Sequence, residues 1–252
     1  YNLINKCINV CLYTQYSETN QITHFTNSLK YLFFHPRTHG SNAFNSTYTS
    51  IDIIMQQLYN SSNYSDSFQL LPFKYNPAFY SSSNSFRMYT IHNDINTSIF
   101  YFHKTNGSTD IINFTSSSKN ARKSRRKNIL QNIKTIKQTL YHNNTKPLII
   151  FCRIDTNPSS PSTYDSTIHI FAILEAVNSI LSSKKISNKI KHDFAIVFTG
   201  CDEFDQLSTK NLMKNIFKDG GYYLYLSGVG VGRPFTLYSQ SNKSSSVIKA
   251  LS

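Results

Sequence analysis

Acidic side chains gather at the ends of two apolar runs in the second half of the chain. The first run, Leu148-Ile149-Ile150-Phe151, is followed by Arg153 and Asp155, and Asp165 lies beyond the next turn. The second run ends in Thr199-Gly200-Cys201-Asp202-Glu203. Carboxylates at the carboxyl ends of strands lie where open α/β sheets place their sites. The pattern therefore indicates a metal site or an acid/base site.

The spacing of these acids suggests how they could cooperate. Arg153 and Asp155 are two residues apart, so we expect them on the same side of the strand. Asp165 follows a Pro-rich turn at 158–161 that can hold it rigidly. The two adjacent acids of the second run can face different ways, one toward a metal and the other toward a substrate. Hard oxygen ligands with a nearby base suit metal-assisted hydrolysis.

A sheet with helical crossovers is expected to position these residues. Short, continuous apolar runs are typical of parallel strands that are covered on both faces. Such runs alternate with segments of helical periodicity, which predicts a right-handed, mostly parallel α/β sheet. The expected elements are strands at 148–151, 194–198, 222–226 and 235–238 and helices at 168–181 and 207–217.

The first half of the chain has weaker signals. Ser50 is predicted to cap a helix with one apolar face. Residues 60–85 are polar and Ser-rich, so we expect them to be irregular. The apolar face comprises Ile51, Ile54, Met55 and Leu58; further helices are predicted at 24–34 and 129–140, and strands at 87–92, 98–103 and 110–114.

Length and ends set limits on the organisation. A chain of 252 residues can bury a core as one large domain or two small ones. No run of about 18 apolar residues occurs, so no transmembrane helix is expected. The chain starts at Tyr1 and stops in a polar segment, which indicates a piece of a longer protein. We expect a lead-in of uncertain structure at 1–23 and a single domain at 24–252, incomplete at its C-terminus.

The formal charge of +13 has two interpretations. Such a charge fits nucleic acid or anionic lipid as a partner. The joint enrichment in Lys, Asn, Ile, Tyr and Phe is also what an AT-rich genome produces, and we favour that explanation. The basic cluster Lys119 to Lys127 lacks interleaved aromatic residues for base stacking, so we do not favour nucleic acid as a partner. We expect this cluster to be a solvated, mobile loop.

Cysteines and glycosylation motifs leave the cellular compartment open. Cys7 and Cys11 form no complete zinc motif. Cys152 and Cys201 each end an apolar strand, so buried free thiols are expected; a disulfide is conceivable if the two strands are neighbours. Asn-x-Ser/Thr motifs occur at Asn45, Asn60, Asn63, Asn96, Asn106, Asn113, Asn143 and Asn242, which is close to the number that this composition produces by chance.

Five sequence blocks, taken in order, carry a family resemblance. They are His35 to Asn42, Cys152 to Asp155, Pro161 to Asp165, Gly200 to Glu203 and Leu226 to Gly232. The blocks are similar to Pro-Arg-x-x-Gly-Ser, His-x-Asp, Pro-Gly-Ala-x-Asp, Gly-Ala-Glu-Glu and Leu-Glu-Ala-Ala-Gly-x-Gly of the zinc aminopeptidases, a family of co-catalytic zinc exopeptidases. The chain most resembles the endoplasmic reticulum metallopeptidase branch. The resemblance implies an α/β fold with a mostly parallel twisted sheet flanked by helices, its C-terminal part missing.

The resemblance also implies a set of roles. Two zinc ions would share the bridging Asp165. The first would also take the residues at the positions of Arg153 and Ser227, and the second would take Glu203 and a histidine near the domain's C-terminus. Asp202 stands at the position of the general base.

This sequence departs from the pattern at those positions. Arg153 is a permanent cation that cannot bind zinc, and Ser227 is a poor ligand. Asp202 is one methylene shorter than Glu, and a misplacement of about 1 Å can cost about 100-fold in rate. No histidine occurs in the last 60 residues. Asp165 and Glu203 alone fall short of the three protein ligands of a catalytic zinc.

Several hypotheses follow. Arg153 could take the place of the first zinc and pair with Asp165 and Glu203, with Asp155 in a supporting position. That hypothesis makes the domain a degenerate pseudopeptidase with no zinc or at most one, held by the two remaining acids. The alternative is an active zinc metalloexopeptidase with Asp202 as its base.

The resemblance further implies a peptide or protein partner. It places the domain in the lumen of the endoplasmic reticulum or another endomembrane compartment, with membrane association through segments outside this chain. Two hypotheses do not depend on peptidase chemistry. One is a protein-interaction module that uses a groove over the site or the segment 60–85. The other is a basic module that binds nucleic acid or anionic membrane through Lys119 to Lys127.

Overall fold

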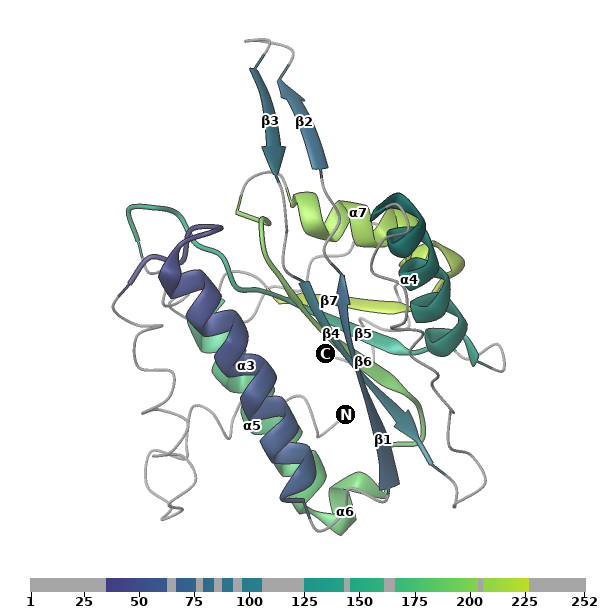
Figure 1. Cartoon of the computed structure of the whole chain (residues 1–252). Coiled ribbons are helices and arrows are strands. Elements are labelled where there is room, and N and C mark those ends of the chain that lie inside the picture. Colours follow the sequence, from purple (N-terminus) through teal and green to yellow (C-terminus); the bar gives the residue numbers. More distant parts are fainter. Residues whose placement is uncertain are drawn as a thin grey trace, which may run out of the picture.

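A five-stranded sheet lies between two pairs of helices (Figure 1). The computed structural model describes residues 35–62, 67–75, 79–83, 88–92, 97–105, 125–142, 146–160, 166–203 and 206–226. Its elements are α3 (Asn42–Asn60), β1 (Phe68–Tyr75), β2 (Phe79–Ser83), β3 (Met88–His92), β4 (Thr97–Lys104), α4 (Arg125–Leu140), β5 (Leu148–Arg153), α5 (Ile168–Ser182), α6 (Lys184–Ser187), β6 (Phe194–Thr199), α7 (Leu207–Asn215), the 3-10 helix η5 (Phe217–Asp219) and β7 (Tyr222–Leu226). The predicted lead-in, the helix at 24–34 and the strands at 110–114 and 235–238 lie outside the described residues.

The sheet is mixed, so the prediction of a mostly parallel sheet is wrong. Its strand order is β1-β4-β6-β5-β7. β5 runs parallel to both β6 and β7, as the alternation of strands and helices predicts. β4 runs antiparallel to both β1 and β6. For β1 and β4 the reason is the connection, because β1 leads to β4 through the β2–β3 hairpin. Hairpin connections join antiparallel strands, whereas parallel strands need a crossover.

β1 and β2 lie within the segment 60–85, so the expectation of irregular structure there is wrong for these residues. β1 contains Pro72, opposite Phe100 of β4. Proline has no N–H to donate to a neighbouring strand and is tolerated at a sheet edge, and β1 is one of the two edge strands of this sheet. Side chains alternate along β1 and pack on both cores, with Phe68 and Leu70 on the α3 and α5 side and Leu71 and Phe73 on the α4 and α7 side. The polar residues that flank the strand within 60–85 hid this apolar run.

α3 begins earlier than the sequence predicts. Ser41 is its N-cap, and the Ser41 hydroxyl accepts a hydrogen bond of 3.1 Å from the backbone N–H of Phe44. Ser50 lies inside the helix, so its predicted role as a cap is wrong. The predicted apolar face is confirmed: Ile51, Ile54, Met55 and Leu58 are all buried.

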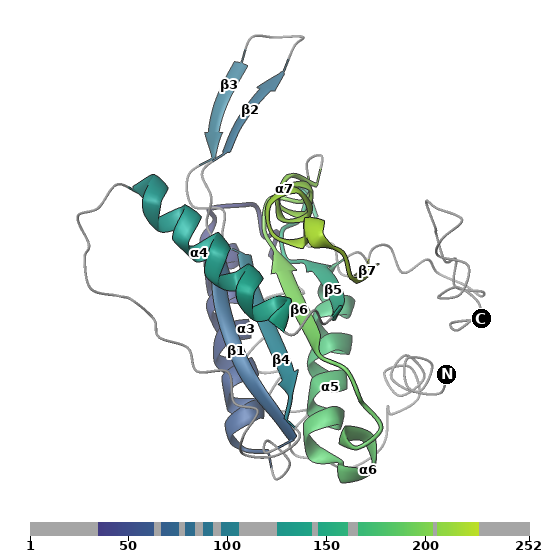
Figure 2. The ribbon, with the colours of Figure 1, turned by 90° about the vertical axis from the view of Figure 1, so that its right-hand side faces the viewer.

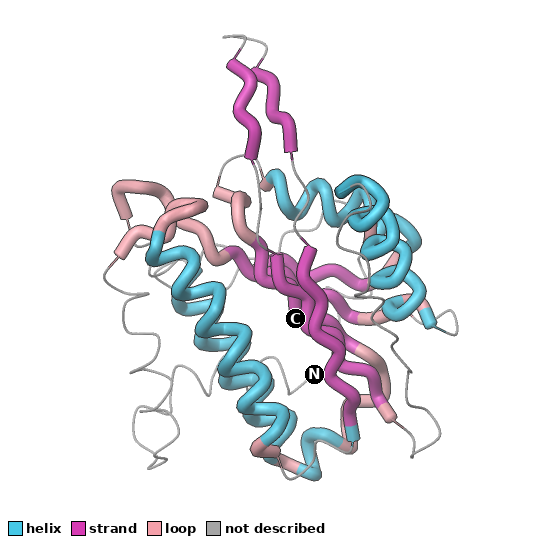
Figure 3. Tube along the Cα trace, viewed as in Figure 1, coloured by secondary structure: helices cyan, strands magenta, loops and turns pink. Residues whose placement is uncertain are grey.

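Two hydrophobic cores lie on the two faces of the sheet. α3 and α5 cover one face, and α4 and α7 cover the other (Figure 2). Side chains alternate along β5, so Phe151 packs on the α4 and α7 side while Cys152 packs on the α3 and α5 side. Figure 3 shows the strands of the five-stranded sheet as one twisted layer between the helices, with the β2–β3 hairpin projecting beyond it. Burying one large apolar side chain contributes about 1.5–3 kcal/mol, so both cores hold the strand ends in place.

The predicted strands at 87–92 and 98–103 are confirmed as β3 and β4, and the remaining predictions concern the second half of the chain. The strands at 148–151, 194–198 and 222–226 and the helix at 168–181 are confirmed to within two residues. α4 begins at Arg125, so residues 125–127 of the basic cluster are helical and not a loop as expected. Within the described residues, no helix is long and apolar enough to cross a membrane.

Candidate functional site

The ends of β5 and β6 bring the predicted acidic residues together. Arg153 pairs with Thr199 in the parallel ladder, and the N–H of Ile154 donates to the Thr199 carbonyl at 2.8 Å. The segments that follow the two strands therefore run side by side, one with Asp155 and the other with Asp202 and Glu203. Asp165 and Ser227, the other predicted site residues, lie outside the described residues.

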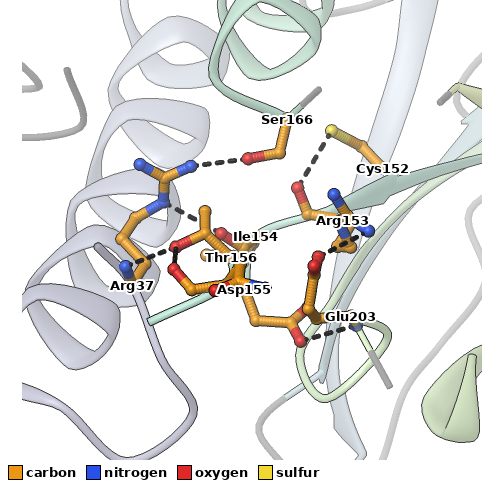
Figure 4. Close-up of polar contacts among 9 residues, drawn as sticks. Arg37, Cys152, Arg153, Ile154, Asp155, Thr156, Ser166 and Glu203 are labelled. Atoms are coloured by element: carbon orange, nitrogen blue, oxygen red, sulfur yellow. Dashed lines mark hydrogen bonds and ion pairs between the residues drawn. The ribbon is translucent and has the colours of Figure 1, made fainter. Parts of the chain in front are cut away.

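Arg153 and Glu203 form an ion pair across this edge of the sheet (Figure 4). Arg153 Nη1 lies 2.8 Å from Glu203 Oε2, and the side chains are 12% and 18% exposed. The contact is an ion pair without the alignment of a hydrogen bond. Mutual attraction is strong for charges this well shielded from water. This contact is one half of the network that the sequence predicts around Arg153; the other half would involve Asp165.

Asp155 joins the two segments from a buried position. Its Oδ2 accepts a hydrogen bond of 2.8 Å from the backbone N–H of Glu203, and the residue is 2% exposed. Burial raises the pKa of Asp155 to about 6, and the nearby Asp202 carboxylate raises it further, against hydrogen bonds from two backbone N–H groups. β5 ends at Arg153, so strand alternation does not determine the direction of Asp155.

Asp202 serves as an acceptor at the start of α7. Its Oδ1 accepts a hydrogen bond of 2.9 Å from the Thr209 backbone N–H, and its Oδ2 accepts one of 2.5 Å from the Thr209 hydroxyl. Burial raises the pKa of Asp202, while hydrogen bonds from Thr199 and Thr209 oppose the shift. Both carboxylate oxygens are engaged and the residue is 2% exposed. A general base must reach the proton that it abstracts, and this carboxylate is directed into the protein instead.

The loop after β6 has unusual backbone geometry on each side of the two acids. Cys201 and Gln206 both adopt left-handed conformations, with φ of 64° and 50°. Such conformations are uncommon for residues other than glycine. They flank the two acids, of which Asp202 contacts Thr209 of α7 and Glu203 contacts Arg153. The adjacent acids therefore do point in different directions, as the sequence analysis allowed.

Arg37 is a residue of the site that the sequence analysis did not single out. It is fully buried, and its Nε donates to the Ile154 carbonyl at 2.9 Å. One Nη donates to the hydroxyls of Ser166 at 2.5 Å and Thr167 at 3.1 Å. The Arg37 backbone exchanges hydrogen bonds with Thr156. Burial lowers the pKa of Arg37 to about 10, so it remains charged at neutral pH. The feature of the sequence that could have identified Arg37 is the Pro-Arg pair ahead of a capped helix.

The two cysteines beside the site are free and buried, which confirms the expectation of free thiols. Burial raises the pKa of the Cys201 thiol to about 11 and that of Cys152 further still. Neutral thiols are poor nucleophiles and poor metal ligands, so neither residue adds chemistry here. Cys7 and Cys11 lie outside the described residues.

The described side chains do not fit zinc. Among them, no group of three or more His, Cys, Asp or Glu is arranged to hold a metal ion. Glu203 is paired with the permanent cation Arg153, and Asp202 is engaged by Thr209. A catalytic zinc needs three protein ligands and an open position. The arrangement instead neutralises one carboxylate with a guanidinium and buries two others.

Comparisons with known proteins show no family. No protein-family model matches the chain, and no curated protein matches it. Among solved structures, the chain is similar to the glutaminyl cyclase of an Acidobacteriales bacterium, at 10% sequence identity and a TM-score of 0.43. The match covers 86% of this chain and 61% of the glutaminyl cyclase chain. The chain thus spans about three-fifths of the length of that protein.

Proposed function

We propose that this chain is a zinc aminopeptidase-like domain that has lost catalysis and keeps its scaffold to bind a peptide or protein partner. The ordered sequence blocks support the peptidase-like scaffold. The Arg153–Glu203 ion pair carries the proposal of lost catalysis, because a guanidinium stands where the resemblance implies a zinc ligand. Arg153 cannot give up its charge, so the position cannot revert to metal binding without mutation.

The state of Asp202 supports the same proposal. An active peptidase of this kind needs a base near the attacking water, and this carboxylate is occupied by Thr209. Releasing it would expose the first N–H groups of α7. Loss of the metal ligand and loss of the base are separate changes, so restoring one leaves the other defect in place.

Metal analysis tests the proposal first. We expect the protein, purified without chelator, to contain no stoichiometric zinc by mass spectrometry and to release no amino acid from peptides with free N-termini. Zinc titration by calorimetry should show no tight site. Two zinc ions per chain together with hydrolysis would overturn the proposal in favour of an active exopeptidase. One zinc per chain would indicate a half-site at Asp165 and Glu203.

Partner binding is tested separately. A pool of synthetic peptides with free N-termini, measured against the same pool with acetylated N-termini, reports whether the scaffold still selects peptides. Binding that survives Asp165→Ala and Glu203→Ala together would favour an interaction surface outside the former site. Absence of binding to both pools would exclude a peptide as the partner and leave a folded protein as the partner.

The compartment is also a proposal. We infer residence in the endoplasmic reticulum or another endomembrane lumen, with a membrane attachment outside this chain, from the sequence resemblance. Glycosidase treatment of the protein expressed with its natural flanking segments should shift its electrophoretic mobility if its Asn-x-Ser/Thr motifs are used. An unchanged mobility, together with protease accessibility in intact microsomes, would contradict a lumenal location.

A further inference from the structure

A group of exposed lysines lies at the end of the sheet away from the candidate site. Lys184 and Lys185 belong to α6, and Lys189 and Lys191 lie in the segment that leads to β6; all four are exposed. We call them the basal lysines. Figure 2 shows α6 beyond the start of β6, at the opposite end from α7 and the loop after β6. This surface is therefore separate from the Arg153–Glu203 edge.

Among the described residues, no acidic side chain neutralises the charge of the basal lysines. In the part of the chain that the structure describes, their ammonium groups form no ion pair or hydrogen bond. The nearest acid in the sequence, Asp193, is buried and turned inward. Its carboxylate accepts hydrogen bonds from the Tyr101 hydroxyl at 2.5 Å and the Lys104 N–H at 2.7 Å, and it lies 3.1 Å from His103 Nδ1.

A fifth lysine, Lys104, connects α6 to the sheet. Lys104 Nζ donates to the Ser187 carbonyl at 3.1 Å and lies 4.5 Å from the centre of the Phe68 ring. The contact fixes α6 against β4. Burial lowers the pKa of Lys104, which is the direction expected for an ammonium group that is partly withdrawn from water. The basal lysines thus project from an anchored segment.

Apolar and basic side chains continue along the adjoining strand ends. Leu148 pairs with Phe194 on one side and with Tyr222 on the other. The Tyr222 N–H donates to the Pro147 carbonyl at 3.2 Å, and Tyr222 is 55% exposed. Lys146, which precedes Pro147 in the sequence, is also exposed. Tyrosine beside lysine is the composition of a membrane–water interface.

We propose that the basal lysines, with Lys146 and Tyr222, bind the surface of an anionic lipid bilayer. Basic side chains near such a surface each contribute attraction, and an amphipathic ring adds interfacial contact. A single-stranded nucleic acid would need several aromatic side chains for stacking, and this surface offers one. Bound in this way, the domain would hold the Arg153–Glu203 edge away from the lipid.

Vesicle binding of the full chain tests the proposal. We expect sedimentation with vesicles of phosphatidylcholine containing phosphatidylserine, but not with phosphatidylcholine alone, and binding that weakens as salt rises. Replacing Lys185, Lys189 and Lys191 by Gln should lower the partition coefficient on the order of 100-fold, since each lysine near the surface is worth roughly fivefold.

A matched variant separates this surface from overall charge. Lys134, Lys214 and Lys218 are exposed on α4, α7 and η5, and replacing them by Gln changes the net charge equally. We expect this control to lose much less affinity. Equal loss in both variants, or equal binding to both kinds of vesicle, would overturn the proposal. Tighter binding of a single-stranded oligonucleotide that depends on the same three lysines would also overturn it, in favour of nucleic acid.

Discussion

At the scale of single residues, Arg153 determines the character of the site. Its guanidinium neutralises Glu203 at a position where two further carboxylates, Asp155 and Asp202, are buried close together. Without this cation, three acidic side chains would lie near one another with less positive charge to offset their negative charge. Breaking a buried ion pair by removing one partner is costly because it leaves a charge unpaired, whereas removing both partners often costs little.

Arg153→Met tests this role. We expect the free energy of unfolding to fall by about 2–3 kcal/mol, somewhat below the cost for fully buried pairs because Glu203 retains some contact with water. The double variant Arg153→Met with Glu203→Gln should recover most of the loss in urea denaturation. Lys137→Met, which breaks the exposed Lys137–Asp219 pair, is the control and should leave stability unchanged. Failure of the double variant to recover would contradict the role of the pair.

Asp155 makes stability depend on pH. Its pKa is raised from the ordinary 3.8 to about 6 in the folded protein, so the folded state holds its proton after the unfolded state has lost it. The stability that Asp155 contributes is therefore full below about pH 4 and falls by roughly 3 kcal/mol as pH rises to about 6.

Asp155→Asn isolates this effect. The neutral amide keeps an acceptor for the Glu203 N–H but cannot ionise. Relative to the unchanged protein, the variant should gain stability between about pH 4 and about pH 7, as measured by urea unfolding at both values. Identical pH dependence of the two proteins would show that Asp155 is not the group that titrates.

At the scale of elements, the start of α7 depends on an acid that precedes it by several residues. Asp202 accepts hydrogen bonds from the backbone and the side chain of Thr209, in the first turn of the helix. The assigned N-cap residue, Gln206, makes no side-chain cap bond. The first N–H groups of a helix lack partners within it, so a carboxylate placed there stabilises the helix.

Asp202→Ala should loosen α7. We expect a loss of about 1–2 kcal/mol, with faster amide hydrogen exchange in the first turns of α7. Asp202→Asn retains an acceptor and should lose less. Ser41→Ala, which removes the cap of α3, serves as the control and should speed exchange in α3 alone. Unchanged exchange in α7 of Asp202→Ala would show that the carboxylate is available for another role.

At the scale of the whole molecule, Arg37 joins three parts of the fold. It connects the segment before α3, the segment after β5 and the start of α5, and its partners are 117 to 130 residues away in the sequence. A planar guanidinium can donate in several directions at once, which an ammonium group cannot reproduce. These contacts hold α3 and α5 at the edge of the sheet that carries the site.

Arg37→Lys should therefore destabilise the protein despite keeping the charge. We expect a loss of about 3 kcal/mol or more, because buried acceptors are left without donors. Ser166→Ala removes a single acceptor and should cost about 1 kcal/mol in the same thermal or urea unfolding measurement. Equal and small effects of the two variants would contradict the central position of Arg37.

The sequence by itself determined four elements of the second half of the chain. β5, β6, β7 and α5 follow from apolar periodicity, which is a local property. That β5 and β6 are neighbours, which brings Asp155 close to Asp202 and Glu203, was seen only in the structure. The mixed sheet, the edge strand containing Pro72 and the true start of α3 were not predicted. Each depends on which segments become neighbours, and local propensity carries little information about that.

Only the tertiary structure decided what the site residues do. Sequence position made Asp202 a candidate base, but its hydrogen bonds with the backbone and side chain of Thr209 make it an acceptor at the start of α7. In the sequence, Arg37 was only one residue of the block His35 to Asn42. The structure shows that it donates to acceptors far away in the sequence. The physical reason is that hydrogen bonding and burial, which set the charge and availability of a side chain, depend on groups brought together from across the chain.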